Sequence, residues 1–347
     1  MASFLLPGQI WAGSMARLAA VDDGDRRSLS QAVARTNAYY KARPAAEILT
    51  ACGETFTVAQ MRAAFSSLAQ FLAREEGDGL ASYIEEHFEP CPPVQVMVTG
   101  YYEPVLAGRL RPDSTFRYAL YSPPAGPARR AGRRELETST MLAGRELVYL
   151  ADEFARFLVH VQGSALVELA DGKRRRLHYA ADNGHPYTSV GKVLVGQGKL
   201  TRSNADLAGI REFFTAHPEQ LTDTLQRNQR FIFFSLSDPL AAEDGAGPPG
   251  ALGQSLVPGR SVALDHGHYG AGGLLLFQGR VPQLDGAQRL SWRPVTRLLV
   301  NHDQGGAIKG PRRLDLFMGQ GAGAARLAGV MREGGQVTYL RPKKDKN

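Results

Sequence analysis

Two aspartates, Asp303 and Asp315, flank a glycine-rich segment close to the end of the sequence. The residues between them include GGAIKG, in which Lys309 carries the only charge, and apolar residues stand on both sides of Asp315. A carboxyl that apolar neighbours keep partly dry has a raised pKa and can act as a general acid near neutral pH. Cleavage of a glycosidic bond is one reaction that needs such an acid.

The same pattern also has a purely structural interpretation. A Gly-Gly pair is typical of a turn between strands. An aspartate at a strand end is commonly hydrogen-bonded or solvated, and only some carboxyls with shifted pKa values mark active sites. Spacing and composition alone leave both interpretations open.

Three histidines, His266, His268 and His302, raise the question of a metal site. In a strand, residues 266 and 268 would point to the same face, and His302 would supply a third ligand. These histidines stand near turns, and no H-x-x-x-H pair or cysteine ligand supports them. We therefore expect no metal and no other cofactor.

Other enzyme classes leave no clear motif in the sequence. A G-x-S-x-G nucleophile elbow is absent, the GQGAGAA segment lacks the acidic partner of a dinucleotide site, and GGAIKG lacks the Walker spacing. Cys52 and Cys91 match no metal motif and either form a disulfide in an exported protein or remain two buried thiols.

The composition is that of a globular protein long enough for two domains, with 347 residues and 43% hydrophobic residues. The net charge of +7 comes from short basic runs, which suit solvated loops better than a nucleic-acid site. An anionic polymer of the cell envelope would suit the same charge equally well. No apolar run is long enough for a transmembrane helix. The N-terminus lacks the pattern of a signal peptide.

Hydrophobic periodicity predicts helices first and strands later. One helix runs from residue 28 to before Pro44, a second follows Thr57 as N-cap, and a third covers 82–87. Later helices are predicted at 204–217, 219–227 and 322–332, the last stopped by Gly334-Gly335, with a loop at 241–250. Strands are predicted at 94–104, 118–121, 157–162, 165–169, 175–179, 230–236, 261–264, 273–277, 295–300 and 336–342. This order predicts an α+β, β-rich protein with two β domains.

Three segments combine aromatic, amide and hydroxyl side chains with glycine. They are TGYYEP (99–104), HVQGS (160–164) and NGHPYTSVG (183–191). Tyrosine rings can stack on sugar rings, and amides or hydroxyls can pair with sugar hydroxyls, so these segments suit a polysaccharide-binding surface. Tyrosine is also common in ordinary strands, and composition leaves that alternative open.

The sequence closely resembles the MltA family, the membrane-bound lytic murein transglycosylases of Gram-negative bacteria. Six segments carry the resemblance between residues 99 and 342: TGYYEP, VHVQGSALVEL, YAADNGHPYTSVG, NQRFIFF, GALGQSLVPGRSVALD and NHDQGGAIKGPRRLDLFMGQG. The resemblance implies a double-psi β-barrel domain formed by both chain ends, a smaller inserted β-barrel domain, and a deep groove between them. We expect residues 1–105 and 228–347 to form the first domain and 106–227 the second.

The resemblance also implies a reaction. These enzymes cleave the β-1,4 bond between N-acetylmuramic acid and N-acetylglucosamine without water, and the C6 hydroxyl of muramic acid forms a 1,6-anhydro end. Because the nucleophile belongs to the substrate, one carboxyl can protonate the leaving oxygen and then take the C6 proton. A hydrolase usually needs two carboxyls.

Carried onto this sequence, the catalytic acid of the family falls on Asp315. Asp303 is expected to orient Asp315 and raise its pKa, and Asp265 to support the site. The backbone amides of Gly305 and Gly306 would contact the glycan or stabilise charge. The expected glycan-binding residues are Thr99, Tyr101, Tyr102, Gln162, Tyr187, Gly305, Gly306 and Lys309.

Two alternatives stand beside this hypothesis. One is a glycan hydrolase on a similar barrel, with a second acid such as Asp182, and the other is a non-catalytic peptidoglycan-binding protein. The sequence also departs from the family, with Asp303-Gln304-Gly305-Gly306 where Asp-Thr-Gly-Gly is expected. The resemblance implies a monomer that binds peptidoglycan strands and no nucleic acid. It also implies a periplasmic location and association with the outer membrane through a lipid anchor that the sequence does not display.

Overall fold

The computed structural model describes residues 22–74, 79–238, 240 and 247–343. The N-terminal segment and most of the loop expected at 241–250 lie outside the described residues. The chain divides into two compact units. The first contains Met1–Gly100, Pro249–Met318 and Met331–Asn347, and the second contains Tyr101–Pro248 and Gly319–Val330.

Six strands close into a β-barrel in the described part of the first unit. Their order around the barrel is β12 (Leu274–Leu284), β13 (Leu290–Asp303), β11 (Ser261–Ala263), β14 (Arg313–Gln320), β4 (Val94–Glu103) and β15 (Arg332–Pro342). β15 returns to pair with β12, so the ring has no free edge. β3 (Phe88–Pro90) adds to β15 outside the ring. The predicted α+β, β-rich class and the barrel built from both chain ends are confirmed.

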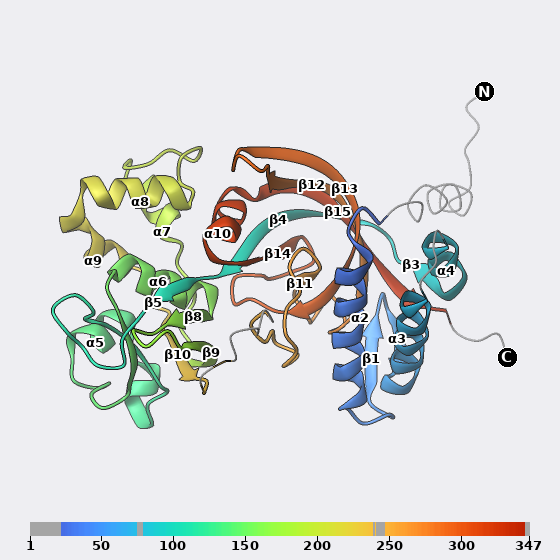
Figure 1. The fold of residues 1–347 in the computed structure, drawn as a ribbon, viewed down its shortest axis with the longest axis horizontal. Coiled ribbons are helices and arrows are strands. Elements are labelled where there is room, and N and C mark those ends of the chain that lie inside the picture. The colour runs from blue at the N-terminus through green and yellow to red at the C-terminus, as the bar shows by residue number, and fades with distance from the viewer. Residues whose placement is uncertain (1–21, 75–78, 239, 241–246, 344–347) are drawn as a thin grey trace. The chain divides into compact units, whose positions relative to one another are not determined.

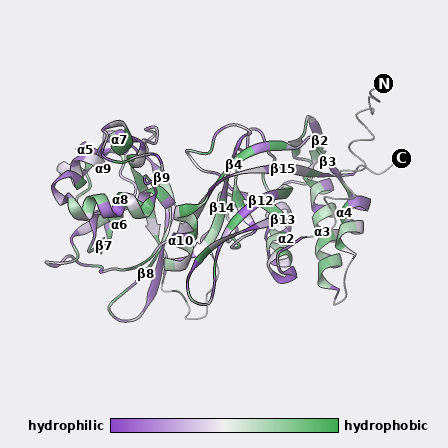
Figure 2. Cartoon of the chain, turned by 90° about the horizontal axis from the view of Figure 1, so that it is seen from above, coloured by the Kyte–Doolittle hydropathy of each residue, from purple (hydrophilic) through white to green (hydrophobic). Residues whose placement is uncertain are grey.

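Two helices flank the barrel core in the first unit, α2 (Arg26–Lys41) and α3 (Val58–Ala73), and Figure 1 shows them side by side. Asp25 caps α2, and Thr57 forms a capping box with Gln60, as the sequence predicts for its role as N-cap. α3 is coloured largely hydrophobic in Figure 2. Met61, Phe65, Leu68 and Leu72, which recur at helical spacing along α3, are buried in the common core. Burial of each such side chain contributes about 1.5–3 kcal/mol.

A hairpin and a disulfide complete the first unit. β1 (Ile48–Ala51) pairs with β2 (Glu54–Thr57), and α4 (Leu80–His87) precedes β3. Cys52, in the hairpin turn, has a left-handed φ of 53° and is bonded to Cys91. Of the two states left open by the sequence, the structure therefore has the disulfide.

The described part of the second unit contains a four-stranded sheet and a two-stranded pair. β10 (Ile232–Leu236), β9 (Arg174–Asp182), β8 (Ala165–Glu168) and β5 (Val105–Ala107) form the sheet, and β6 (Tyr118–Tyr121) pairs with β7 (Glu146–Leu150). Both contribute to one hydrophobic core that includes Leu120, Val148, Leu177 and Phe234. The helices are α5 (Arg133–Thr138), α6 (Glu153–Gln162), α7 (Val190–Gly196), α8 (Leu207–Ala216), α9 (Leu221–Leu225) and α10 (Gly321–Val330), with short 3-10 turns at Gly126–Arg130 and Pro218–Gln220.

One predicted element and one predicted helix stop are wrong. Residues 157–162 belong to helix α6, because Asp152 caps it and Phe154, Phe157 and Val159 are buried on it. Gly334 and Gly335 lie within strand β15 and do not stop α10. A Cβ on Gly335 would lie 2.5 Å from the ring of Phe277, so this strand position needs a residue without a side chain.

The predicted insert of 106–227 is shorter than the second unit. β10 pairs with β9 along Ile232–Leu236, so this strand belongs to the sheet of the insert. α10 also groups with this unit, through contacts with α8. In the part of the chain that the structure describes, no helix is both long and apolar enough to cross a membrane.

Candidate active site

Three carboxyl groups gather at the end of strand β11. Ala263, its last residue, pairs with Asp303 on the parallel strand β13 and with Asp315 on the antiparallel strand β14. Neighbouring strands lie about 4.8 Å apart, so the two aspartate backbones stand roughly 10 Å apart with β11 between them. Asp265 follows β11 by two residues. The barrel therefore places the three aspartates predicted from the sequence near the end of the same strand.

Asp315 keeps one of its carboxyl oxygens away from water. Its side chain is half-buried, and Oδ1 is inaccessible to water and has no hydrogen-bond partner among the described residues. Burial raises the pKa of this carboxyl to about 6, and the charge of Asp303 raises it too. A hydrogen bond with Thr99 and the charge of Arg313 lower it. A carboxyl with this pKa is suited to donate and accept a proton near neutral pH.

Asp303 is held by backbone N–H groups. Its Oδ1 accepts hydrogen bonds from Ala251 N and Gln304 N, both at 2.9 Å. Its carbonyl oxygen accepts a bond from Leu264 N at 3.1 Å, which fixes the start of the loop after β11. Asp303 is thus a fixed charge beside Asp315.

Asp265 ties two loops together. Its Oδ2 accepts a bond from Gly310 N at 2.8 Å, and its Oδ1 accepts one from Gly267 N at 3.0 Å. These backbone bonds, and to a smaller degree Lys309, lower the pKa of Asp265. Because both oxygens accept bonds and the ionised form is favoured, Asp265 is a poor general acid at neutral pH.

The glycine-rich loop after Asp303 is compact at its start. Ile308 N donates to Gly305 O at 3.0 Å, and Ile308 is buried beneath the turn. A Cβ on Gly305 would lie 2.9 Å from Ile308 Cγ1, so a side chain there would displace Ile308. Gly306 and Lys309 are exposed. This exposure leaves both residues accessible to a ligand.

A buried histidine next to Asp303 connects the barrel to helix α2. His302 Nδ1 lies 2.8 Å from Ser261 Oγ, and Nε2 lies 2.9 Å from Thr36 Oγ1 on α2. Ser261 Oγ also accepts a bond from Val257 N. Burial lowers the pKa of His302 to about 3, so the ring is neutral.

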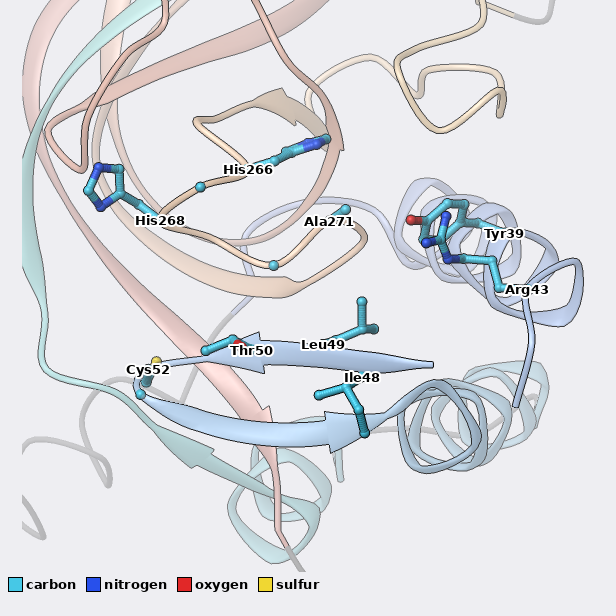
Figure 3. A pocket seen from close by; sticks show the side chains of 12 residues that line it. Tyr39, Arg43, Ile48, Leu49, Thr50, Cys52, His266, His268 and Ala271 are labelled. Carbon is cyan, nitrogen blue, oxygen red and sulfur yellow. The ribbon is translucent and has the colours of Figure 1, made fainter. Parts of the chain in front are cut away.

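The metal arrangement considered from the sequence does not form. Both nitrogens of His302 are occupied, and residues 266–268 form a turn and not a strand. His266 and His268 point in different directions in Figure 3, so the expectation that they share a strand face is wrong. His266 Nε2 lies 3.1 Å from Asp303 O. Among the described residues, no group of three or more His, Cys, Asp and Glu residues could hold a metal ion.

A cavity of about 570 Å³ lies between the β1 hairpin and the loop after Asp265 (Figure 3). Its charged residue Arg43 pairs with Glu47 and stands over the ring of Tyr39. No carboxyl group lines this cavity, so it is separate from the candidate acid. The lining residues are Tyr39, Arg43, Ile48, Leu49, Thr50, Cys52, Gly53, His266, Gly267, His268, Gly270 and Ala271.

The other predicted glycan-binding residues belong to the second unit. Tyr102 is only 7% exposed, and its N–H donates to Gln162 Oε1 at 3.1 Å. Tyr187 is 37% exposed. Tyr101 is half-buried. A role of these four side chains in glycan binding stays a prediction.

Asp182, the candidate second acid, is already engaged in the second unit. It accepts bonds from Arg230 Nη2 at 2.6 Å, Tyr179 Oη at 2.7 Å and Gly184 N at 2.7 Å. Burial alone would raise the pKa of Asp182, but these partners lower it overall. This environment is that of a structural carboxylate.

Sequence reasoning missed Arg313 and Glu103. Arg313 shares a strand face with Asp315, and the period of two along RRLDLF could have revealed it. Glu103 is fully buried in the second unit, where Arg176 Nε donates to Oε1 at 2.9 Å and Gln320 Nε2 to Oε2 at 2.5 Å. No local pattern predicts that contact, because its partners lie far apart in the chain.

Two protein-family models match the chain. The MltA specific insert domain matches residues 128–235, within the second unit, and the 3D domain matches residues 260–341, which include β11 to β15. A curated relative, membrane-bound lytic murein transglycosylase A of Escherichia coli strain K12, is 32% identical over 248 residues, 71% of this chain and 66% of the relative. The match thus spans just under two thirds of that relative.

Solved structures extend the similarity to most of the chain. Lytic transglycosylase LtgG of Burkholderia pseudomallei is 32% identical, with a TM-score of 0.58 and 91% of each chain covered. Escherichia coli MltA with bound chitohexaose is 25% identical, with a TM-score of 0.70, and 96% of this chain and 91% of that one are covered. With the insert domain and the aspartate-bearing barrel both matched, the chain belongs to the MltA family.

Proposed function

We propose that this chain is a lytic murein transglycosylase. It cleaves the β-1,4 bond between N-acetylmuramic acid and N-acetylglucosamine in peptidoglycan without water and leaves 1,6-anhydromuramic acid ends. The observation that carries the proposal is the Asp315 carboxyl, dry on the Oδ1 side and with its pKa raised to about 6. Relatives named lytic murein transglycosylase and a neighbour with bound chitohexaose support a glycan of this class as the substrate.

In this proposal Asp315 acts twice. The protonated carboxyl donates its proton to the glycosidic oxygen as the bond to C1 breaks. The resulting carboxylate then accepts the proton of the C6 hydroxyl as that oxygen bonds to C1, which restores the acid. Burial keeps the pKa of Asp315 high and the charge of Asp303 raises it further. Asp265 positions the loop that carries Gly305, Gly306 and Lys309 against the glycan.

The remaining carboxyls support a single acid. Asp265 and Asp182 are ionised and engaged, and Asp303 accepts two backbone bonds. A retaining hydrolase would need a nucleophilic carboxylate about 5–5.5 Å from the acid, and an inverting one a base about 6.5–9.5 Å away to activate water. Asp303 is the described carboxyl nearest in the strand register, so it is the residue to test for that alternative.

The disulfide supports action outside the cytoplasm. Disulfides form and persist in oxidising compartments, and Cys52–Cys91 is such a bond. We infer that the protein works at the peptidoglycan of the periplasm as a monomer. The name of its relative includes the word membrane-bound, and we propose association with the outer membrane on the family resemblance.

The decisive experiment digests purified sacculi in water enriched in oxygen-18 and identifies the products by mass spectrometry. The proposal predicts 1,6-anhydro ends without label, and none from D315N. Labelled reducing ends would identify a hydrolase, and D303N would then test the second carboxyl. Retention of sacculi by both proteins with no products from either would identify a binding protein.

A further inference from the structure

Two buried polar atoms at the candidate site lack a hydrogen-bond partner in the described part of the chain. One is Nε of Arg313, a donor, and the other is Oδ1 of Asp315, an acceptor. Buried polar groups are paired in the great majority of cases, because an unpaired one loses its hydrogen bonds to water without replacement. A complementary pair of unmatched atoms in one site therefore calls for an explanation.

The strand places these two side chains together. Arg313 and Asp315 are two residues apart on β14, so their side chains leave the same face with backbones about 6.6 Å apart. That distance is within the reach of an arginine side chain. The intervening residue, Leu314, is fully buried on the other face. Arg312, one residue earlier, is exposed.

Thr99 on β4 connects the same two groups. Arg313 Nη2 donates to Thr99 Oγ1 at 3.3 Å, and the side chain of Thr99 lowers the pKa of the Asp315 carboxyl through hydrogen bonding. A hydroxyl has one proton to donate. Because its oxygen accepts from the guanidinium, that proton is directed toward Asp315. The guanidinium thus orients the hydroxyl that contacts the candidate acid.

We propose that Arg313 is a positioning residue whose guanidinium, through Nε–H and through Thr99, receives the Asp315 carboxylate each time this acid gives up its proton. While Asp315 is protonated, its Oδ1 and the Nε of Arg313 are not hydrogen-bonded to each other. After proton donation, the negative Oδ1 takes the Nε–H bond, and the bond is released when Asp315 accepts the C6 proton. Arg313 stays protonated throughout, so charge and protons balance. This role rests on the proposed function for the identity of the acid.

The opposing neighbours of Asp315 then have separate tasks. Asp303 favours the protonated acid, while Arg313 and Thr99 favour the carboxylate. A general acid–base that acts in both directions needs neither form too stable, because each must be regained in every cycle. The position of Arg313 next to Asp315 supplies the second half of that balance.

The first test measures the titration of Asp315 directly, by carbon NMR of protein labelled at aspartate carboxyl carbons, with D315N identifying the signal. R313Q and T99V are expected to raise the pKa of Asp315. The matched controls are R312Q, which removes an exposed arginine one residue away, and T99S, which keeps the hydroxyl. Both are expected to titrate like the parent protein. This measurement is independent of turnover and therefore separates failure of the inference from failure of the proposed function.

The second test compares pH profiles of glycan cleavage. Loss of one charge-assisted hydrogen bond is expected to lower kcat of R313Q about tenfold to a hundredfold and to move the alkaline limb to higher pH. R313K, which keeps a charge without the Nε–H, is expected to recover part of kcat. Equal pKa values and profiles for R313Q and R312Q would overturn the proposal. A second pair of results would also overturn it. In that case the activity of R313Q falls only in proportion to the loss of folded protein, and Asp315 has the same pKa in T99V as in T99S.

Discussion

Asp303 and Asp315 have the same register partner, Ala263, and approach it from opposite sides of β11. This arrangement fixes the separation of the two carboxyls through backbone hydrogen bonds and not through side-chain contacts alone. A fixed negative charge beside a buried carboxyl disfavours its ionisation. The barrel thus places a charge where it helps burial to raise the pKa of the proposed acid.

Removal of the Asp303 charge should shift the pH dependence of cleavage. Asp303 raises the pKa of Asp315, so D303N lets Asp315 ionise at lower pH. Because the reaction needs the protonated acid, the alkaline limb of kcat/KM is expected to move to lower pH. Loss of orientation adds a fall in rate of about tenfold to a hundredfold at pH 7.

The D303N shift is measured from pH profiles on soluble glycan strands from pH 4 to pH 8. D285N, which removes an exposed aspartate from the distant β12–β13 turn, is the control and should match the parent profile. An alkaline limb of D303N at or above that of the parent protein would contradict the assigned role.

D315N should inactivate the protein and stabilise its fold at neutral pH. The pKa of Asp315 is about 6 in the folded protein against an ordinary value of 3.8. A raised carboxyl pKa favours the folded state at low pH, and this contribution is lost as pH rises through about 6. D315N avoids that loss, so its free energy of unfolding at pH 7 is expected to exceed that of the parent protein by about 1–3 kcal/mol.

Urea unfolding at pH 7 and at pH 4 provides the measurement for D315N. The advantage of the variant should shrink at pH 4, where the carboxyl of the folded parent protein is protonated. A variant that is equally stable or less stable than the parent at pH 7 would show that Asp315 carries no burial penalty.

Local sequence patterns predicted the helices and strands of this fold better than the long-range pairing that closes the barrel. The Thr57 N-cap and the neighbouring strands β8 and β9 follow from residues close in sequence. The strand predicted at 157–162 failed because an apolar run of that length suits a buried helix face equally well. Asp152, which caps this helix, is the local signal that favours a helix over a strand here.

The candidate site was predicted in part, for a physical reason. Residue type, spacing and apolar neighbours indicated Asp303 and Asp315, and the resemblance to a family added Asp265 and the separate roles of the three aspartates. The contacts of Thr99 with Arg313 and of Thr36 with His302 join residues more than 200 positions apart, and they depend on the closure of the barrel. Such contacts produce no local sequence pattern from which they could be predicted.

Loss of the disulfide should weaken the first unit. Cys52 and Cys91 close a loop with a sequence separation of 39, and chain entropy of the unfolded state predicts a stabilisation of about 2–4 kcal/mol. The double variant C52S/C91S is expected to lose that amount in urea unfolding. The parent protein under reducing conditions should behave in the same way.

Reducing agent added to C52S/C91S is the control for the disulfide, since that variant has no bond to break. Unfolding midpoints of the parent protein that are identical with and without reductant would contradict the prediction. Activity on glycan strands is expected to persist, because Asp315 and its partners are held by barrel strands and not by the hairpin.

His302 should make the fold sensitive to moderate acid. Its pKa is about 3 in the folded protein against an ordinary value of 6.5, because the buried ring stays neutral between Ser261 and Thr36. Below pH 6.5 the histidine of the unfolded chain binds a proton, while His302 of the folded chain stays neutral. His302 therefore lowers the free energy of unfolding progressively from pH 6.5 toward pH 3.

Asp315 acts in the opposite direction over part of this range, and H302Q in a D315N background isolates the histidine. Urea unfolding of D315N between pH 7 and pH 4 is expected to show a steep loss of stability, and D315N/H302Q a shallower one from a starting value about 1–3 kcal/mol lower. Parallel curves for the two proteins would mean that His302 takes up its proton without unfolding, and that the buried network tolerates the charge.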